Sequence, residues 1–278
     1  MKKMKILSVV PLLFTLGYAG STTAKISYEH LNFDNSKTKD QGNIYGVALN
    51  HKTENALYQI AYGKTHTDTF QPPQPKDLRV NKYYLKYTYM LDDKQALSAS
   101  FATIDDNLMK ETDGGNIYGL GYKYAAFGLT QYVSDYRNFN VYQTDMKYKF
   151  KKEFGEIHTS ATILGKYIYL QDRKSNGFSR NAKKNYFTPG VKLHAHYDEY
   201  HMAVGVFFGK RVFAVMNDGF KVQHHAMEFN ESYMFGFGKH FGDVDLNVKY
   251  AYQRATELPI DNHNVKVQNI GLVLRYRF

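Results

Sequence analysis

The last ten residues, Asn269-Ile-Gly-Leu-Val-Leu-Arg-Tyr-Arg-Phe278, carry the pattern that decides the fold. Apolar side chains occupy every second position, at Ile270, Leu272, Leu274, Tyr276 and Phe278. The positions between them include Arg275 and Arg277. A period of two residues places the two sets on opposite faces of a β-strand. The end of the chain therefore predicts a strand with one continuous apolar face and one basic face.

The same alternation is repeated along the chain. It is clearest over 82–91, over 142–150 and over 187–208, where Asp198-Glu199 separates two alternating stretches. No stretch has the spacing of an amphipathic helix. The segments predict 14 antiparallel strands, near 25–34, 43–51, 55–65, 79–91, 95–105, 116–125, 127–136, 140–150, 156–170, 186–197, 200–212, 227–241, 244–255 and 265–278. An even number suits a closed up-and-down barrel, and a 12-stranded barrel is the alternative.

The predicted connections also alternate in length. Short ones lie at 52–54, 92–94, 198–199 and 242–243. Long polar ones lie at 65–78, 106–115, 171–185, 213–226 and 256–264. Transmembrane barrels have short periplasmic turns and long extracellular loops, so this alternation favours that class.

Composition narrows the class further. The chain has 278 residues, of which 43% are hydrophobic and 16% aromatic, with 25 Tyr and no Trp. Past residue 24 there is no apolar run of about 18 residues, so no spanning helix is expected. The absence of cysteine excludes a disulfide, a thiolate nucleophile and a cysteine metal site.

A soluble β-sandwich also shows alternation, and two features disfavour it. Small residues and lysines dominate the polar face, as at Gly119, Gly121 and Lys123. Tyrosines gather near the ends of the predicted strands, at Tyr83, Tyr118, Tyr124, Tyr167, Tyr169, Tyr197 and Tyr200. Tyrosine favours the headgroup level of a bilayer, and only a closed sheet satisfies its backbone within lipid. We therefore expect an all-β transmembrane barrel.

The first 24 residues are typical of a cleaved signal peptide. Lys2, Lys3 and Lys5 form a basic start, an apolar stretch follows, and small residues occupy 20–24. We predict cleavage after Ala24, with cleavage after Ala19 as the alternative. Residues 25–278 would then form a single domain, exported through the inner membrane.

The chain resembles Gram-negative outer-membrane β-barrel proteins throughout residues 25–278. Its end, Leu-Arg-Tyr-Arg-Phe at 274–278, is similar to the C-terminal signature of that class. The resemblance implies that the barrel-assembly machinery reads Tyr276 and Phe278. In size and strand count the chain resembles small monomeric 14-stranded porins. Fatty-acid transporters share that barrel size but carry an N-terminal plug, for which a first strand near Lys25 leaves no room.

The polar face predicts a water-filled, net basic lumen. The alternation in each predicted strand gives the side chains that should point into the pore. The cations among them are Lys82, Lys86, Lys123, Lys147, Lys149, Lys166, Lys192, Arg211, Lys249, Arg275 and Arg277. The acids include Asp145, Glu156 and Asp245. Basic side chains around a pore favour anions. We therefore expect a porin-like channel for small hydrophilic solutes with a mild anion preference.

Three histidines offer a weak candidate metal site. His196 and His201 would face each other across the turn at Asp198-Glu199, with His194 on the same face. Neighbours across two strands lie about 5 Å apart at Cβ, a separation that suits two imidazoles on one metal ion. Simple lining of the lumen is the competing interpretation.

Other functions remain as alternatives. A barrel that binds, adheres or has a structural role through its loops is the second candidate. An outer-membrane hydrolase is third, because Arg173-Lys174-Ser175-Asn176-Gly177 resembles the nucleophile region of outer-membrane phospholipase A. In that pattern a histidine stands where this chain has Arg173, and a guanidinium cannot accept the serine proton.

We therefore expect no enzymatic activity and no cofactor. The expected partners are outer-membrane lipid and lipopolysaccharide, besides the assembly machinery and the solutes, and the expected state is a monomer. The sequence pI of about 9.3 would also suit a nucleic-acid partner, but the export signal and the apolar faces predict none.

Overall fold

The computed structural model describes residues 20–70, 77–109, 112–171, 181–223 and 226–278. Alternating segments form long strands throughout. The strands are β1 (Ser21–Asp34), β2 (Lys39–Lys52), β3 (Ala56–Thr69), β4 (Leu78–Met90), β5 (Gln95–Asp106), β6 (Asn116–Tyr124), β7 (Phe127–Tyr136), β8 (Phe139–Phe154), β9 (Ile157–Gln171), β10 (Asn185–Tyr197), β11 (Tyr200–Phe207), β12 (Val215–Met216), β13 (Lys221–Val222), β14 (Met227–Phe241), β15 (Val244–Glu257) and β16 (Asn262–Arg277).

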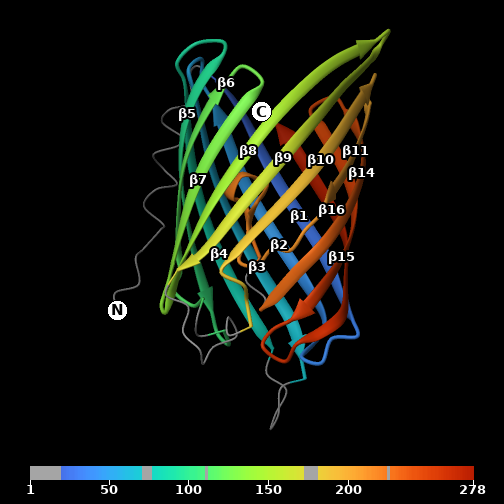
Figure 1. Ribbon diagram of the computed structural model, residues 1–278. Coiled ribbons are helices and arrows are strands. Elements are labelled where there is room, and N and C mark those ends of the chain that lie inside the picture. Colours follow the sequence, from blue (N-terminus) through green and yellow to red (C-terminus); the bar gives the residue numbers. More distant parts are fainter. Residues whose placement is uncertain (1–19, 71–76, 110–111, 172–180, 224–225) are drawn as a thin grey trace.

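Fourteen of these strands close into one antiparallel barrel (Figure 1). Each strand pairs with its neighbour in sequence, β1 pairs with β16, and β11 pairs with β14 because β12 and β13 form a separate two-stranded sheet. The predicted fold class and strand number are confirmed, and the 12-stranded alternative is wrong. Within the described residues, no helix is long and apolar enough to cross a membrane.

The two ends of the barrel differ in their connections. At one end, named here the turn end, lie the connections 53–55, 91–94, 125–126, 155–156, 198–199 and 242–243, the start of β1 and Phe278. At the other, the loop end, the chain passes from β1 to β2, β3 to β4, β5 to β6, β7 to β8, β9 to β10, β11 to β14 and β15 to β16. Both described ends of the chain thus lie at the same end of the barrel, as an even number of strands requires.

The outward face is a band of apolar and aromatic side chains. It carries Ile26, Leu85, Leu120, Ile163 and Leu272, which are 46–71% exposed. Tyrosine rings contact one another across neighbouring strands in a tilted arrangement, with centroids 5.1 Å apart for Tyr58–Tyr87 and 5.2 Å apart for Tyr62–Tyr83. So much exposed apolar surface is typical of a protein that faces lipid.

Most strand boundaries lie within a few residues of the prediction, and the largest differences are at β1, β2, β3, β8 and β11. β1 begins at Ser21, because Thr22 accepts a hydrogen bond from the Phe278 amide (2.9 Å) and Thr23 pairs with Arg277. β11 ends at Phe207, because the chain turns at Gly209, whose φ of +83° suits glycine.

In the sequence, Glu231 shares its alternate positions with Met227, Phe229, Tyr233 and Phe235, so an acid falls in an apolar series. A β-bulge in β14 accounts for it. The register with β15 shifts between Phe229 and Glu231, so Met227 and Phe229 turn inward and are buried. Glu231 stays on the outward face, where it pairs with Arg254 on β15 at 3.4 Å. The bulge therefore moves the side chains of Met227 and Phe229 to the inner face of the barrel and leaves Glu231 on the outer face.

Candidate functional site: the lumen and its inserted loop

Between β11 and β14, residues 208–223, named here the inserted loop, fold back into the barrel (Figure 1). Val212, Phe213, Ala214 and Val215 are almost fully buried, although they lie in a connection. The loop contains β12, the 3-10 helix η2 (Asn217–Gly219) and β13. The sequence predicted a long polar loop here, but its first half is apolar enough to need burial.

The loop packs into an apolar cluster that fills part of the loop-end half of the lumen. Phe213 lies at its centre, 4.8 Å from the Phe139 ring and 5.9 Å from the Tyr136 ring. The wall contributes inward apolar side chains from β4 to β10, including Val80, Ile104, Ile117, Tyr132, Val141, Ile168 and Tyr186. In this half the inward face of the wall is therefore apolar, because these inward positions cover the loop.

Polar contacts fix the loop on the wall. The Gln143 side chain donates to the Val215 carbonyl (2.7 Å) and accepts from the Val215 amide (2.8 Å). The Tyr84 hydroxyl donates to the Asp218 carbonyl at 2.7 Å. Because the contacts to Gln143 satisfy both backbone groups of one buried residue, they set the depth of the loop in the barrel.

Charged contacts hold its tip. Lys147 on β8 pairs with Asp218, and Lys221 pairs with Glu29 on β1 at 3.1 Å. Gly219 has a φ of +106°, and a Cβ there would lie 2.5 Å from the Tyr84 ring. The tip therefore reaches opposite walls of the barrel, and its close approach to β4 requires glycine.

The turn-end half of the lumen holds a cavity of 410 Å³, named here the basic cavity. Its lining includes six lysines, Lys86, Lys123, Lys147, Lys149, Lys166 and Lys192. Asp218 is the acidic residue in the same lining. On the β1–β4 side of the loop tip lies a second cavity, of 130 Å³, to which Lys25, Glu29, Lys82 and Lys221 contribute.

The strand register places most of the predicted pore-lining residues on the inner face. These are Lys82, Lys86, Lys123, Lys147, Lys149, Lys166, Lys192, Lys249, Arg275, Arg277, Asp145 and Asp245. Asp145 pairs with Lys166, and Asp245 lies 3.3 Å from the Arg275 guanidinium. Both acids therefore offset cations of the wall.

Two of the predicted pore-lining residues lie elsewhere. Glu156 is exposed in the two-residue turn between β8 and β9, because β8 continues to Phe154. Arg211 is fully buried where the loop leaves the wall, and it donates to Gln223 (2.9 Å) and to Ser232. Arg211 therefore joins the inserted loop to β14 and does not line an open pore.

The sequence prediction missed four of the charged residues that line the two cavities. Lys25 and Glu29 alternate with Ile26 and Tyr28 on β1, so the period alone could have placed them inside. Asp218 and Lys221 lie on the inserted loop, and no periodic pattern marks a loop that turns inward.

The three candidate histidines all lie on the inner face near the turn end, at the paired ends of β10 and β11. His196 is opposite His201 in the register, as predicted, and the His194 and His201 rings stack at 6.0 Å. The hydrolase-like string 173–177 lies outside the described residues.

Comparisons with known proteins agree with this architecture. No protein-family model matches the chain, and no curated protein matches it. Among solved structures, a bacterial polysaccharide outer membrane secretin superposes with a TM-score of 0.58 at 7% identity, over 92% of this chain and 98% of that one. The Acinetobacter baumannii outer membrane protein Omp33 superposes with a TM-score of 0.50 at 10% identity, over 93% of this chain and 99% of that one. The chain therefore has the fold of outer-membrane β-barrel proteins.

Proposed function

We propose that the chain is an outer-membrane channel for the passive diffusion of small hydrophilic solutes, with a preference for anions. The observation that carries this proposal is the basic cavity, in which six lysines line 410 Å³ of the lumen beside one acid. Fixed charges of one sign inside low-dielectric walls concentrate ions of the opposite sign.

The outward face supports the location. A band of exposed apolar side chains on a closed sheet suits lipid, where every backbone group must be paired within the protein. In the proposed orientation the turn end faces the periplasm and the loop end faces outward. Outer-membrane lipid, lipopolysaccharide and the assembly machinery would then be its partners, and fractionation with heat-modifiable migration on gels would test this placement.

The start of β1 bears on processing. We propose that the signal peptide ends at Ala19 and not at Ala24. Ser21, Thr22, Thr23 and Ala24 pair with β2, and the last three of them also contact the end of the chain. Cleavage after Ala24 would remove these contacts, whereas cleavage after Ala19 keeps them.

The inserted loop supports a narrow, selective channel. It lies between opposite walls of the lumen, where Asp218 contributes to the basic cavity and Lys221 to the second cavity. A 14-stranded barrel is intermediate between 8-stranded barrels, which side chains fill, and 16-stranded porins with aqueous channels. We therefore expect small conductance steps.

Ion selectivity in a planar bilayer tests the proposal. In a gradient of KCl at low concentration, the reversal potential should have the sign for chloride preference. The preference should weaken near 1 M salt, because the Debye length falls from about 10 Å at 0.1 M to about 3 Å at 1 M. Cation preference at low salt, or no conductance from folded barrels, would contradict it.

A further inference from the structure

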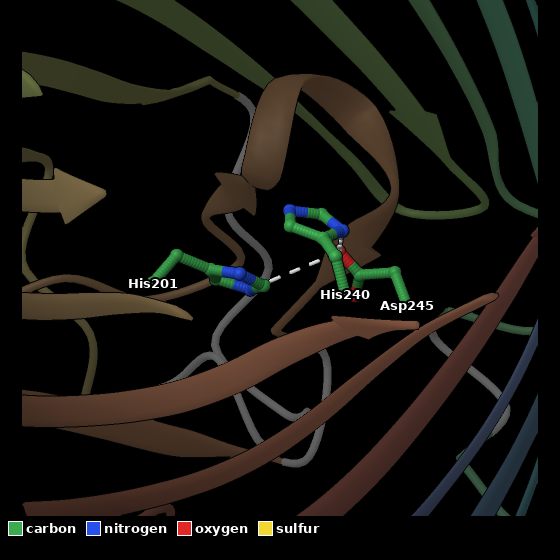
Figure 2. Close-up of side chains that lie close together, drawn as sticks. All are labelled: His201, His240 and Asp245. Carbon is green, nitrogen blue, oxygen red and sulfur yellow. Dashed lines mark ion pairs between the residues drawn. The ribbon is translucent and has the colours of Figure 1, made fainter. Parts of the chain in front are cut away.

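The inner wall at the turn end carries a cluster of imidazoles beside one carboxylate. His201 lies on β11, His240 on β14 and Asp245 on β15, and their side chains converge inside the barrel (Figure 2). The Asp245 Oδ2 atom lies 3.0 Å from the Nδ1 atom of His240 and 3.9 Å from the Nε2 atom of His201. One potential ligand atom from each residue lies within 4.8 Å of the others.

These separations suit a metal ion. With bonds of about 2.0–2.1 Å, the ligand atoms of a tetrahedral zinc site lie roughly 3.3 Å apart. The distances of 3.0 Å and 3.9 Å are on either side of that value. Small side-chain rotations would therefore bring the three groups into range of one ion.

Gly238 makes the arrangement possible. It lies on β14 directly opposite His201, and a Cβ there would be 2.4 Å from the His201 Nε2 atom and 2.7 Å from the Asn247 Oδ1 atom. Without that Cβ, the His201 ring lies across β14 and reaches Asn247 on β15, at 2.6 Å. The glycine thus lets residues from three strands meet.

The neighbours of the cluster hold the groups in place. Asn247 and the Arg275 guanidinium contact the Oδ1 atom of Asp245, so Oδ2 is the oxygen that faces the two histidines. The Nδ1 atom of His201 is buried and has no hydrogen-bond partner among the described residues. A metal-ligating histidine is neutral and carries its proton on the nitrogen that does not bind the ion. Binding through Nε2 of His201 would therefore replace its hydrogen bond to Asn247 and leave the proton on Nδ1.

We propose that His201, His240 and Asp245 bind one divalent transition-metal ion of the Zn²⁺ class at the turn-end mouth of the lumen. Imidazoles with one carboxylate suit Zn²⁺, Cu²⁺ or Ni²⁺, whereas Mg²⁺ and Ca²⁺ prefer oxygen ligands alone. The positive charge of Arg275 repels the bound cation, and the negative charge of Asp245 compensates for this repulsion. The site is independent of the proposed channel activity.

Further histidines extend the cluster toward the rim. The His196 ring lies 5.7 Å from His240, and the His158 ring lies 6.5 Å from His196. His194 stacks on His201 from the other side. These imidazoles lie beside the ligands near the turn end, where they could transfer an ion to the site.

Calorimetric titration of the full-length mature barrel, folded in detergent and free of any polyhistidine tag, tests the site with ZnCl2. One Zn²⁺ should bind per barrel, and MgCl2 and CaCl2 should give no comparable heat. His201→Ala and His240→Ala should each weaken binding by roughly tenfold or more. Gly238→Ala should also weaken binding, because its Cβ displaces His201 while every ligand remains.

His66→Ala is the matched control, because His66 pairs with Asp77 at the loop end, in a second His/Asp group. It should bind Zn²⁺ like the unmodified protein, and heat-modifiable migration should show that each variant folds. Three results would overturn the proposal. The first is loss of Zn²⁺ binding in His66→Ala and in no other variant, and the second is that His201→Ala and His240→Ala bind Zn²⁺ as tightly as the unmodified protein. The third is that the folded, unmodified barrel does not bind Zn²⁺.

A measurement on the unmodified protein tests the same ligands without depending on the folding of any variant. The electron paramagnetic resonance spectrum of one bound Cu²⁺ should show coupling to two imidazole nitrogens. A spectrum without nitrogen coupling would overturn the assignment.

Discussion

The two halves of the lumen have opposite chemistry, although the same strands build both. In the loop-end half, inward side chains such as Val80, Ile104 and Ile168 are buried against the inserted loop. In the turn-end half, the inward positions of the same strands carry lysines, such as Lys86 and Lys166, which line the basic cavity. The apolar half therefore sets how much of the lumen is open, and the basic half sets which ions favour it.

This difference explains why a two-residue period is insufficient to describe the lumen. The period determines which face a side chain occupies, and it does so equally in both halves. What an inward side chain contacts depends on the loop, which comes from a distant part of the chain. The contact between Gln143 and Val215 spans 72 positions in the sequence.

Removal of the loop should have the largest effect. Replacement of 213–222 by a short Gly-Ser linker should raise single-channel conductance by roughly threefold or more, because the barrel is wide enough to hold water once the loop is gone. The sign of the ion preference should stay the same, because most lysines of the cavity lie on the wall. Unchanged conductance would mean that the loop does not narrow the path.

Truncation of the central aromatic residue should have the next largest effect. Phe213→Ala should lower the free energy of unfolding by about 3–5 kcal/mol, since it leaves a cavity in a close-packed cluster. Phe220→Ala is the matched control, because Phe220 belongs to the same loop but is 37% exposed. Equilibrium unfolding in urea gives both values, and equal losses would contradict the placement of Phe213 at the centre.

The smallest effect is expected from one hydrogen bond at the tip. Tyr84→Phe removes the bond to the Asp218 carbonyl and keeps the ring against Phe220, 4.1 Å away. The cost should be about 1 kcal/mol, seen as more frequent current fluctuations with unchanged ion preference. A shift in the ion preference would show that the loop tip, and not the wall, sets it.

The sequence predicted the barrel well, because strands and turns are recognised from residues that are close together in the chain. Alternation in stretches such as 269–278 gives the inward and outward faces, and the turn residues give the number of strands. It failed where a distant contact decides the outcome. The extension of β1 to Ser21 depends on the end of the chain, and the burial of Phe213 depends on the wall of β4–β10.

The candidate site was predicted in part for the same reason. His194, His196 and His201 share one hairpin, so their common face follows from local pairing. His240 and Asp245 belong to the next hairpin, and only the closed sheet brings them beside His201. No spacing in the sequence joins the two hairpins.

The central claim is that lysines on the turn-end wall make the channel prefer anions. The most direct test is the reversal potential of the triple variant with Lys86, Lys149 and Lys192 changed to Glu, in a KCl gradient at low salt. A matched control changes Lys52, Lys94 and Lys239 to Glu, which alters net charge equally but lies outside the lining of the basic cavity. We predict chloride preference in the unmodified protein and the control, and potassium preference in the lumenal variant with little change in conductance. The same ion preference in all three proteins would contradict the claim.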